Sequence, residues 1–171
     1  MPEVATAVTM KGNPVTLLGK EIKVGQVAPD CTLVTGDLSE VKLSSYKGKK
    51  CIISVVPSLD TGICDLQTKR FNKEAAKLGS DVSILTISMD LPFAQKRWCG
   101  ATATDKITML SDYRYAQFGE AYGVLIKGLR LLTRAIFITD KKGTIQYKQI
   151  VPEITTEPDY NSVLEAVKKI N

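Results

Sequence analysis

The sequence of 171 residues contains no histidine. This absence excludes the Cys–His and Ser–His–Asp arrangements of nucleophilic enzymes, and it excludes zinc and haem sites that are built on imidazole. Any reactive side chain must therefore be activated by backbone dipoles, by hydroxyl groups, or by arginine and lysine. Such activation suits attack on an electrophile that carries a good leaving group and needs little proton shuttling.

Paired cysteines and long apolar runs are also missing. The four cysteines, at positions 31, 51, 64 and 99, form no C-x-x-C pair, which argues against a thioredoxin-type dithiol and a paired-knuckle zinc site. Residues 1–20 contain no continuous apolar segment of a secretory signal, and no later segment approaches the roughly 18 apolar residues of a membrane span. We therefore expect a cytoplasmic protein without membrane association, whose cysteines are reactive thiols rather than a disulfide framework. The length and a hydrophobic content of 44% predict a single domain over residues 1–171.

The net charge of +5 raises the question of nucleic-acid binding. The basic pairs are spread along the chain among acidic residues, and no aromatic residues are interleaved with them to form a binding platform. A solvated surface therefore explains the net charge better than a nucleic-acid interface does. The same distribution of basic residues is compatible with a mild attraction to acidic protein partners.

The segment 57–64 carries the strongest chemical signal. The short β-branched run 51–56 predicts an interior strand, which Pro57 ends because it cannot donate to a ladder. If Thr61 is the N-cap of the helix that follows, Cys64 is the third helical residue, and its side chain turns back toward the Thr61 hydroxyl. Free amide N–H groups and the helix dipole favour an anion there, and in such surroundings the pKa of a cysteine falls well below its reference of about 8.5.

The helix after this segment is predicted to be amphipathic. Its inward face is expected to carry Cys64, Thr68, Phe71, Ala75 and Leu78, with Lys69, Lys73 and Glu74 off that face. Cys64 therefore points toward the edge of the core, where a free cysteine is also commonly a small buried hydrophobe. Thr61-x-x-Cys64 alone is a weak signal, but the full spacing Pro57-x-x-x-Thr61-x-x-Cys64 between a strand and an amphipathic helix favours a functional thiol.

The rest of the sequence predicts an α/β fold. The expected elements are a hairpin over 8–18, short strands near 31–34 and 40–43, interior strands over 51–56 and 82–88, a short helix from 92 to 99–100, further strands over 107–110, 135–139 and 144–151, and a closing helix over 158–170. This order describes a thioredoxin-like sandwich with a central mixed sheet flanked by helices and an N-terminal β-hairpin. The Cys64 helix then begins at the carboxyl end of a central strand, where open α/β sheets place their sites.

These motifs resemble the peroxiredoxin family, and within it the bacterial thiol peroxidase branch, an atypical two-cysteine group. The resemblance covers nearly the whole chain and rests on segments 57–64, 71–76, 88–99, 131–135 and 153–160. It implies reduction of hydrogen peroxide and of organic hydroperoxides, such as alkyl and lipid hydroperoxides, without a cofactor, with thioredoxin as the reductant and with a homodimeric assembly. By the same resemblance Cys64 is the peroxidatic cysteine, Thr61 and Arg134 activate it, Pro57 shields the pocket, and Cys99 is the resolving cysteine.

The role implied for Arg134 has a separate physical argument. When a thiolate attacks a peroxide, charge moves from the sulfur to the departing oxygen, so fixed donors near both atoms favour the reaction. Arg134 is the one charge on a strand face that is otherwise apolar, and an inward guanidinium needs an anion. The alternatives are that Arg134 reaches solvent or pairs with an acid, or that Arg130 takes this role.

Cys99 follows Cys64 by 35 positions, and a strand and two helices are expected to separate the two. A disulfide requires Cα atoms within about 7 Å, so we expect no contact in the reduced protein. Our hypothesis is that Cys64 oxidises to a sulfenic acid and that both cysteine segments then unwind locally and join, which the neighbouring Trp98 should report by its fluorescence. The alternative for Cys99 is a buried structural residue at the end of a helix. Cys31 and Cys51 are expected to be structural, although relatives usually carry an apolar or aromatic residue in place of Cys31.

Two functions from different classes are compatible with this sequence. The first is a thioredoxin-dependent hydroperoxide reductase that uses an intramolecular disulfide. The second is a non-enzymatic redox sensor or partner-binding domain, in which oxidation of Cys64 exposes a docking surface. Catalytic turnover distinguishes the first from the second.

Overall fold

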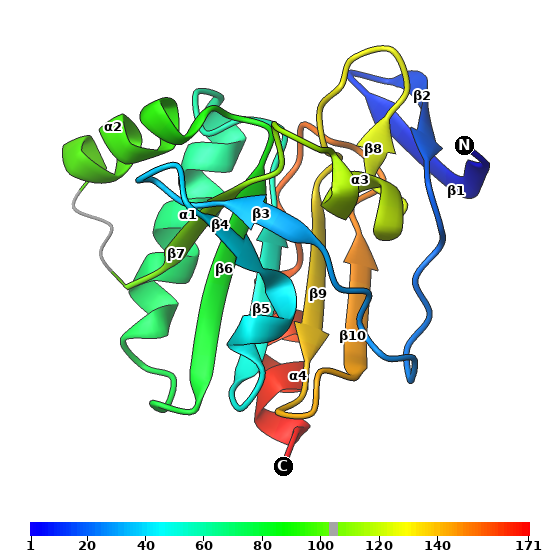
Figure 1. Cartoon of the computed structure of the whole chain (residues 1–171). Helices are drawn as coiled ribbons and strands as arrows, with labels where there is room; N and C mark the ends of the chain where they lie inside the picture. Colours follow the sequence, from blue (N-terminus) through cyan, green and yellow to red (C-terminus); the bar gives the residue numbers. More distant parts are fainter. Residues whose placement is uncertain (103–105) are drawn as a thin grey trace.

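A mixed β-sheet runs through the centre of the molecule. The computed structural model describes residues 1–102 and 106–171. The central sheet has seven strands in the order β10-β9-β5-β6-β7-β3-β4 (Figure 1). Its strands are β3 (Thr32–Val34), β4 (Glu40–Lys42), β5 (Lys50–Val55), β6 (Val82–Ser88), β7 (Thr108–Ser111), β9 (Ala135–Thr139) and β10 (Ile145–Ile150). Strands β5, β6 and β7 are parallel to one another, whereas β9 is antiparallel to β5.

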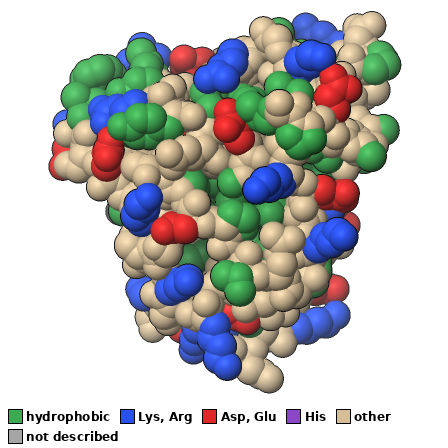
Figure 2. Space-filling model, turned by 45° about the vertical axis from the view of Figure 1, so that its right-hand side comes forward, with side chains coloured by type: hydrophobic (Ala, Val, Ile, Leu, Met, Phe, Trp, Pro, Cys, Tyr) green, Lys and Arg blue, Asp and Glu red, His purple; other side chains and the backbone are tan. Residues whose placement is uncertain are grey.

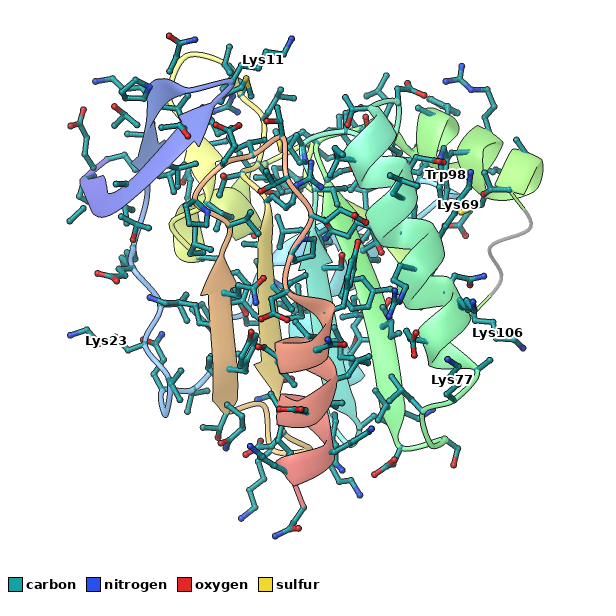
Figure 3. All side chains as sticks on the ribbon, turned by 180° about the vertical axis from the view of Figure 1, so that it is seen from behind. Lys11, Lys23, Lys69, Lys77, Trp98 and Lys106 are labelled. Carbon is teal, nitrogen blue, oxygen red and sulfur yellow. The ribbon has the colours of Figure 1, made fainter. Side chains whose placement is uncertain are left out.

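Both faces of the central strands are buried, which explains why β5 reads as a continuous apolar run. Ile52 points to one face, where it packs with side chains of α1 (Gly62–Ala75) and α4 (Tyr160–Lys169). Figure 3 shows these two helices lying on the same face of the sheet. Ile53 and Val55 point to the opposite face, toward the five-residue helix α3 (Gln117–Ala121) and the 3-10 helix η1 (Leu43–Tyr46).

The expected N-terminal hairpin is present. It consists of β1 (Glu3–Met10) and β2 (Asn13–Leu18), joined by a turn in which Lys11 and Gly12 have φ values of 51° and 79°. The sequence did not predict that β2 pairs with a further strand, β8 (Leu125–Ile126), which makes a separate three-stranded sheet. The predicted class, a central mixed sheet flanked by helices with an N-terminal hairpin, is confirmed.

Three predicted helix boundaries were wrong. Helix α2 spans Pro92–Thr102, so Gly100 does not end it, and the helix continues to Thr102, whose hydroxyl donates to the Trp98 carbonyl oxygen. Helix α4 begins at Tyr160 rather than 158, because the Asp159 side chain caps it by accepting from the Ser162 backbone N–H.

Helix α1 is the third case, because it ends before Leu78. The prediction for its inward face holds for Cys64, Thr68 and Phe71, which are buried, but Glu74 is buried as well. The Glu74 carboxylate can occupy this position because Arg70 and Lys77 lie 3.0 Å and 3.6 Å from its oxygens.

Charged side chains of both signs lie on the face of the molecule drawn in Figure 2. Asp and Glu side chains stand among the Lys and Arg side chains over most of this face, and the basic side chains are more numerous toward its lower end. Within residues 1–102 and 106–171, no helix combines the length and apolar character needed to cross a bilayer.

Candidate active site

Cys64 lies in the first turn of α1, at the carboxyl end of the central strand β5. Thr61 is the N-cap of this helix, with extended backbone angles, and Gly62 is its first residue. Cys64 is therefore the third helical residue, as the sequence predicted. Its side chain has no exposed surface, and it packs with Val56, Leu59 and Trp98 in a small cluster at the end of the sheet.

The Thr61 hydroxyl faces the sulfur. Its oxygen lies 2.8 Å from Cys64 Sγ and also 2.8 Å from the Ser58 carbonyl oxygen. A hydroxyl has one proton to donate, and it also accepts. When Cys64 is a thiol, it can donate to Thr61 while Thr61 donates to Ser58. When Cys64 is a thiolate, the Thr61 proton can turn to the sulfur, so one hydroxyl serves both states of the thiol.

Arg134 reaches the same sulfur from the other side. It precedes β9 by one residue, and its side chain is almost fully buried, with 2% exposed. The guanidinium donates from Nε to the Ile154 carbonyl oxygen at 2.8 Å and from Nη1 to Gln67 Oε1 at 2.8 Å, and Nη2 lies 3.4 Å from Cys64 Sγ. Arg130, the alternative candidate, is exposed in the turn after β8.

The charge of Arg134 has no carboxylate partner in the part of the chain that the structure describes. None of the ion pairs found there involves Arg134. A buried charge is unfavourable unless an opposite charge or hydrogen bonds compensate for it. Two of the three groups that its N–H groups contact are neutral oxygens, so among these three only the Cys64 sulfur can become an anion.

Gln67 is a site residue that the sequence analysis missed. It is fully buried on α1, three positions after Cys64 and on the same side of the helix. Its oxygen accepts from Arg134, and its amide nitrogen donates to Ser54 Oγ on β5 at 2.7 Å. Gln67 thereby fixes the orientation of the guanidinium. A polar residue at the i+3 position from a predicted inward cysteine was the available signal.

Asp90, just beyond β6, holds the loop before α1. Its carboxylate accepts from Ser58 Oγ at 2.7 Å and from the Leu59 backbone N–H at 2.8 Å. Pro57 is buried at the start of this loop. The Ser58 carbonyl oxygen that Asp90 thereby positions is the one that accepts from Thr61.

Cys99 lies on α2, the helix next to α1. It is partly buried and packs against the cluster that contains Cys64, and both thiols are free. The structure therefore brings Cys64, Thr61 and Arg134 into direct contact, whereas Cys99 stands on a neighbouring helix without a bond to Cys64.

The two remaining cysteines have a different environment. Burial raises the pKa of Cys31 to about 12, and it also raises the pKa of Cys51. Both thiols pack in the core on the side of the sheet away from α1. The cations that act on them are Lys42 and Lys49, and no hydrogen bond from a guanidinium to either sulfur is present among the described residues, so both suit a structural role.

Comparisons with known proteins relate this chain to thiol peroxidases. A family model described as Redoxin matches residues 23–164. A thiol peroxidase of Bacillus subtilis (strain 168) is 56% identical over 163 residues, which cover 95% of this chain and 97% of the relative. A thiol peroxidase of Staphylococcus saprophyticus is 50% identical over 95% of this chain and 98% of its own length.

Solved structures show the same similarity in three dimensions. The crystal structure of a peroxiredoxin-like protein from Aquifex aeolicus has a TM-score of 0.90 and 47% identity, with 98% of this chain and 99% of that chain covered. A thiol peroxidase from Chromobacterium violaceum, at 19% identity, shares the fold with a TM-score of 0.87, and 97% of each chain is covered.

Proposed function

This chain belongs to the Redoxin family and, within it, to the thiol peroxidases, and we propose that Cys64 is its peroxidatic cysteine and Cys99 its resolving cysteine. It is a thiol-dependent peroxidase, so the hypothesis of a non-enzymatic sensor is not retained. The observation that carries the assignment of Cys64 is the buried Arg134 guanidinium 3.4 Å from its sulfur.

In the first step, the Cys64 thiolate attacks the terminal oxygen of a hydroperoxide. A sulfur–oxygen bond forms and the oxygen–oxygen bond breaks, which leaves a sulfenic acid and an alkoxide or hydroxide that takes up a proton. Arg134 and the Thr61 hydroxyl are the two donors at the sulfur, and they are positioned to follow the charge as it moves to the departing oxygen. Pro57 closes the loop side of this site and keeps water from the sulfur.

In the second step, the Cys99 sulfur attacks the sulfenic sulfur of Cys64. The disulfide bond forms, the sulfur–oxygen bond breaks, and hydroxide leaves as water with the proton of the Cys99 thiol. A thioredoxin dithiol then reduces the disulfide through a mixed disulfide and becomes oxidised itself, and both thiols of this chain are restored. The position of Cys99 against the Cys64 cluster on the neighbouring helix supports this pairing.

We further propose hydrogen peroxide and organic hydroperoxides, including alkyl and lipid hydroperoxides, as the substrates. Leu91 and Phe93, beside Asp90 at the start of α2, are 50% and 65% exposed, and such apolar surface near the Cys64 loop supports acceptance of alkyl groups. The whole chain is proposed to act as one catalytic domain, in the cytoplasm and as a homodimer.

A coupled assay with thioredoxin, thioredoxin reductase and NADPH tests this proposal. Cys64→Ser should abolish peroxide-dependent NADPH consumption, and Cys99→Ser should abolish thioredoxin-linked turnover while it leaves the first oxidation of Cys64 intact. Cys31→Ser is the matched control and should keep wild-type turnover, because that thiol lies in the core away from the site. Full turnover by Cys99→Ser would refute the resolving role.

A further inference from the structure

Trp98 is next to Cys99 in the sequence and packs in the cluster that buries Cys64. It precedes Cys99 on α2, and only 8% of its surface is exposed, because its ring packs in the cluster with Val56, Leu59 and Cys64. Cys99 itself is partly buried and packs against this cluster. Since Cys64 has no exposed surface, another sulfur can reach it only after neighbouring side chains move. The Trp98 ring is the largest of these neighbours.

Asp65 holds this ring in place. It follows Cys64 in the first turn of α1, and its Oδ1 accepts from the Trp98 indole N–H at 3.0 Å. The other carboxylate oxygen, Oδ2, binds Lys69 Nζ at 2.8 Å on the exposed side of the helix. Figure 3 shows Trp98 and Lys69 near each other where α1 and α2 lie side by side, and Asp65 contacts both of them. A hydrogen bond from a largely buried donor to a carboxylate belongs to the stronger class of protein hydrogen bonds.

A second contact between the same segments is weaker. Arg97 lies 3.4 Å from Asp60, but both side chains are mostly exposed, and exposed ion pairs contribute little. Of these two links, the Asp65–Trp98 bond is the stronger connection between the first turn of α1 and the part of α2 that carries Cys99.

We propose that Asp65 and Trp98 form a gate that sets the rate at which Cys99 reaches oxidised Cys64. The gate rests on the proposed function, because it acts on the resolution step. While the gate is closed, the sulfenic acid of Cys64 persists, and it can react with a second hydroperoxide to give a sulfinic acid. When the indole N–H leaves Asp65, α2 is free to move and the disulfide forms. Asp65 is in this sense a positioning residue, which acts on the reaction through Trp98.

The gate predicts a faster resolution step when the hydrogen bond is removed. Asp65→Ala removes the acceptor, and Trp98→Phe removes the donor while it keeps an apolar ring. After one equivalent of hydrogen peroxide, rapid quenching with a thiol-alkylating reagent and mass spectrometry measure disulfide formation and the sulfinic fraction of Cys64. Each variant should form the disulfide about tenfold faster than wild type, since one such bond no longer stabilises the closed state. Both should accumulate less sulfinic acid at high peroxide concentration.

Three comparisons separate a gate from a general loss of structure. The double variant should be no faster than either single variant, because both remove the same bond. Asp65→Asn, which keeps an acceptor for the indole N–H, should restore a rate close to that of wild type. Lys69→Met is the matched control: it removes the other contact of Asp65 and should leave the rate unchanged.

Two results would overturn the gate. One is a disulfide rate within twofold of wild type in both single variants, and the other is an equal acceleration in Lys69→Met. Failure of the proposed function has a different signature, since the wild-type protein would then form no Cys64–Cys99 disulfide with peroxide. In that case the gate proposal would be refuted as well.

Discussion

Replacing Gln67 by leucine tests whether the orientation of Arg134 matters for the reaction. Leucine is close in volume but offers neither acceptor nor donor, so Arg134 Nη1 and Ser54 Oγ both lose a buried partner. Each buried group left without a partner costs about 1–3 kcal/mol, and a charged one more. The free energy of unfolding should therefore fall by about 2–5 kcal/mol.

The same change should slow the oxidation of Cys64. A hydrogen bond to a charged group contributes about 1.5–3 kcal/mol. If the whole of this free energy orients the guanidinium for the reaction, losing the bond raises the activation free energy by the same amount and lowers the rate roughly 10- to 150-fold. Stopped-flow measurement of the tryptophan signal against hydrogen peroxide gives the second-order rate constant, because Trp98 is the one tryptophan of the chain. Urea titration of the reduced protein gives the unfolding free energy.

Two further variants make the result decisive. Thr68→Val on the same helix removes a buried hydroxyl that donates to the Cys64 carbonyl oxygen, so it should lower stability without slowing oxidation as much. Gln67→Glu restores an acceptor for Arg134, but it also gives the guanidinium a carboxylate partner that competes with the Cys64 thiolate, so it should recover stability without recovering the wild-type rate. If Gln67→Leu oxidised at the wild-type rate, or if Thr68→Val slowed oxidation equally, the orienting role of Gln67 would be wrong.

Three other predictions concern single groups. Thr61→Val should slow oxidation by peroxide about tenfold or more, and Thr61→Ser should restore it, because the hydroxyl and not the methyl group faces the sulfur. Hydrogen bonds from Thr155, Thr9 and the Gly12 backbone hold the pKa of Glu153 below its ordinary value. The ionised Glu153 therefore stabilises the fold above about pH 4.5, and this stabilisation is lost as the pH falls. The thermal unfolding temperature of Glu153→Gln should depend less on pH below that value than the unfolding temperature of the wild type. Burial raises the pKa of Cys31 to about 12, so iodoacetamide at pH 8 should leave Cys31 unmodified in the native protein and modify it in urea. Rapid modification of Cys31 in the native protein would contradict its place in the core.

The parts of the fold that could be predicted from the sequence depend on local signals. Strands β6 and β9 have the predicted bounds because each is a short β-branched run between turn residues, and Asp140 accepts within its own turn from the backbone of Lys142 and Thr144. The position of Cys64 was predictable for the same reason, since a proline, an N-cap and a helix face lie within a few residues of one another.

Other parts depend on contacts between distant segments. Strand β8 has only two residues, and it is defined by pairing with β2, more than a hundred positions earlier. Helix α3 has only five residues and follows Ala116, which has a φ of 53°, and its N-terminal amides at Phe118 and Gly119 are satisfied by the Asp112 carboxylate. No periodicity over so few residues distinguishes such elements from loop.

The placement of Gln67 and Ile154 shows how the active site is assembled from distant segments. In a chain without histidine, an oriented cation is the strongest available means of stabilising a thiolate, and a guanidinium is oriented only if its remaining N–H groups are bound. Arg134 receives one acceptor from α1, through Gln67, and one from the loop after β10, through the Ile154 carbonyl oxygen. The third direction is left for the sulfur. Because these acceptors come from segments 67 and 20 positions away from Arg134, the sequence could identify the cation but not the residues that aim it.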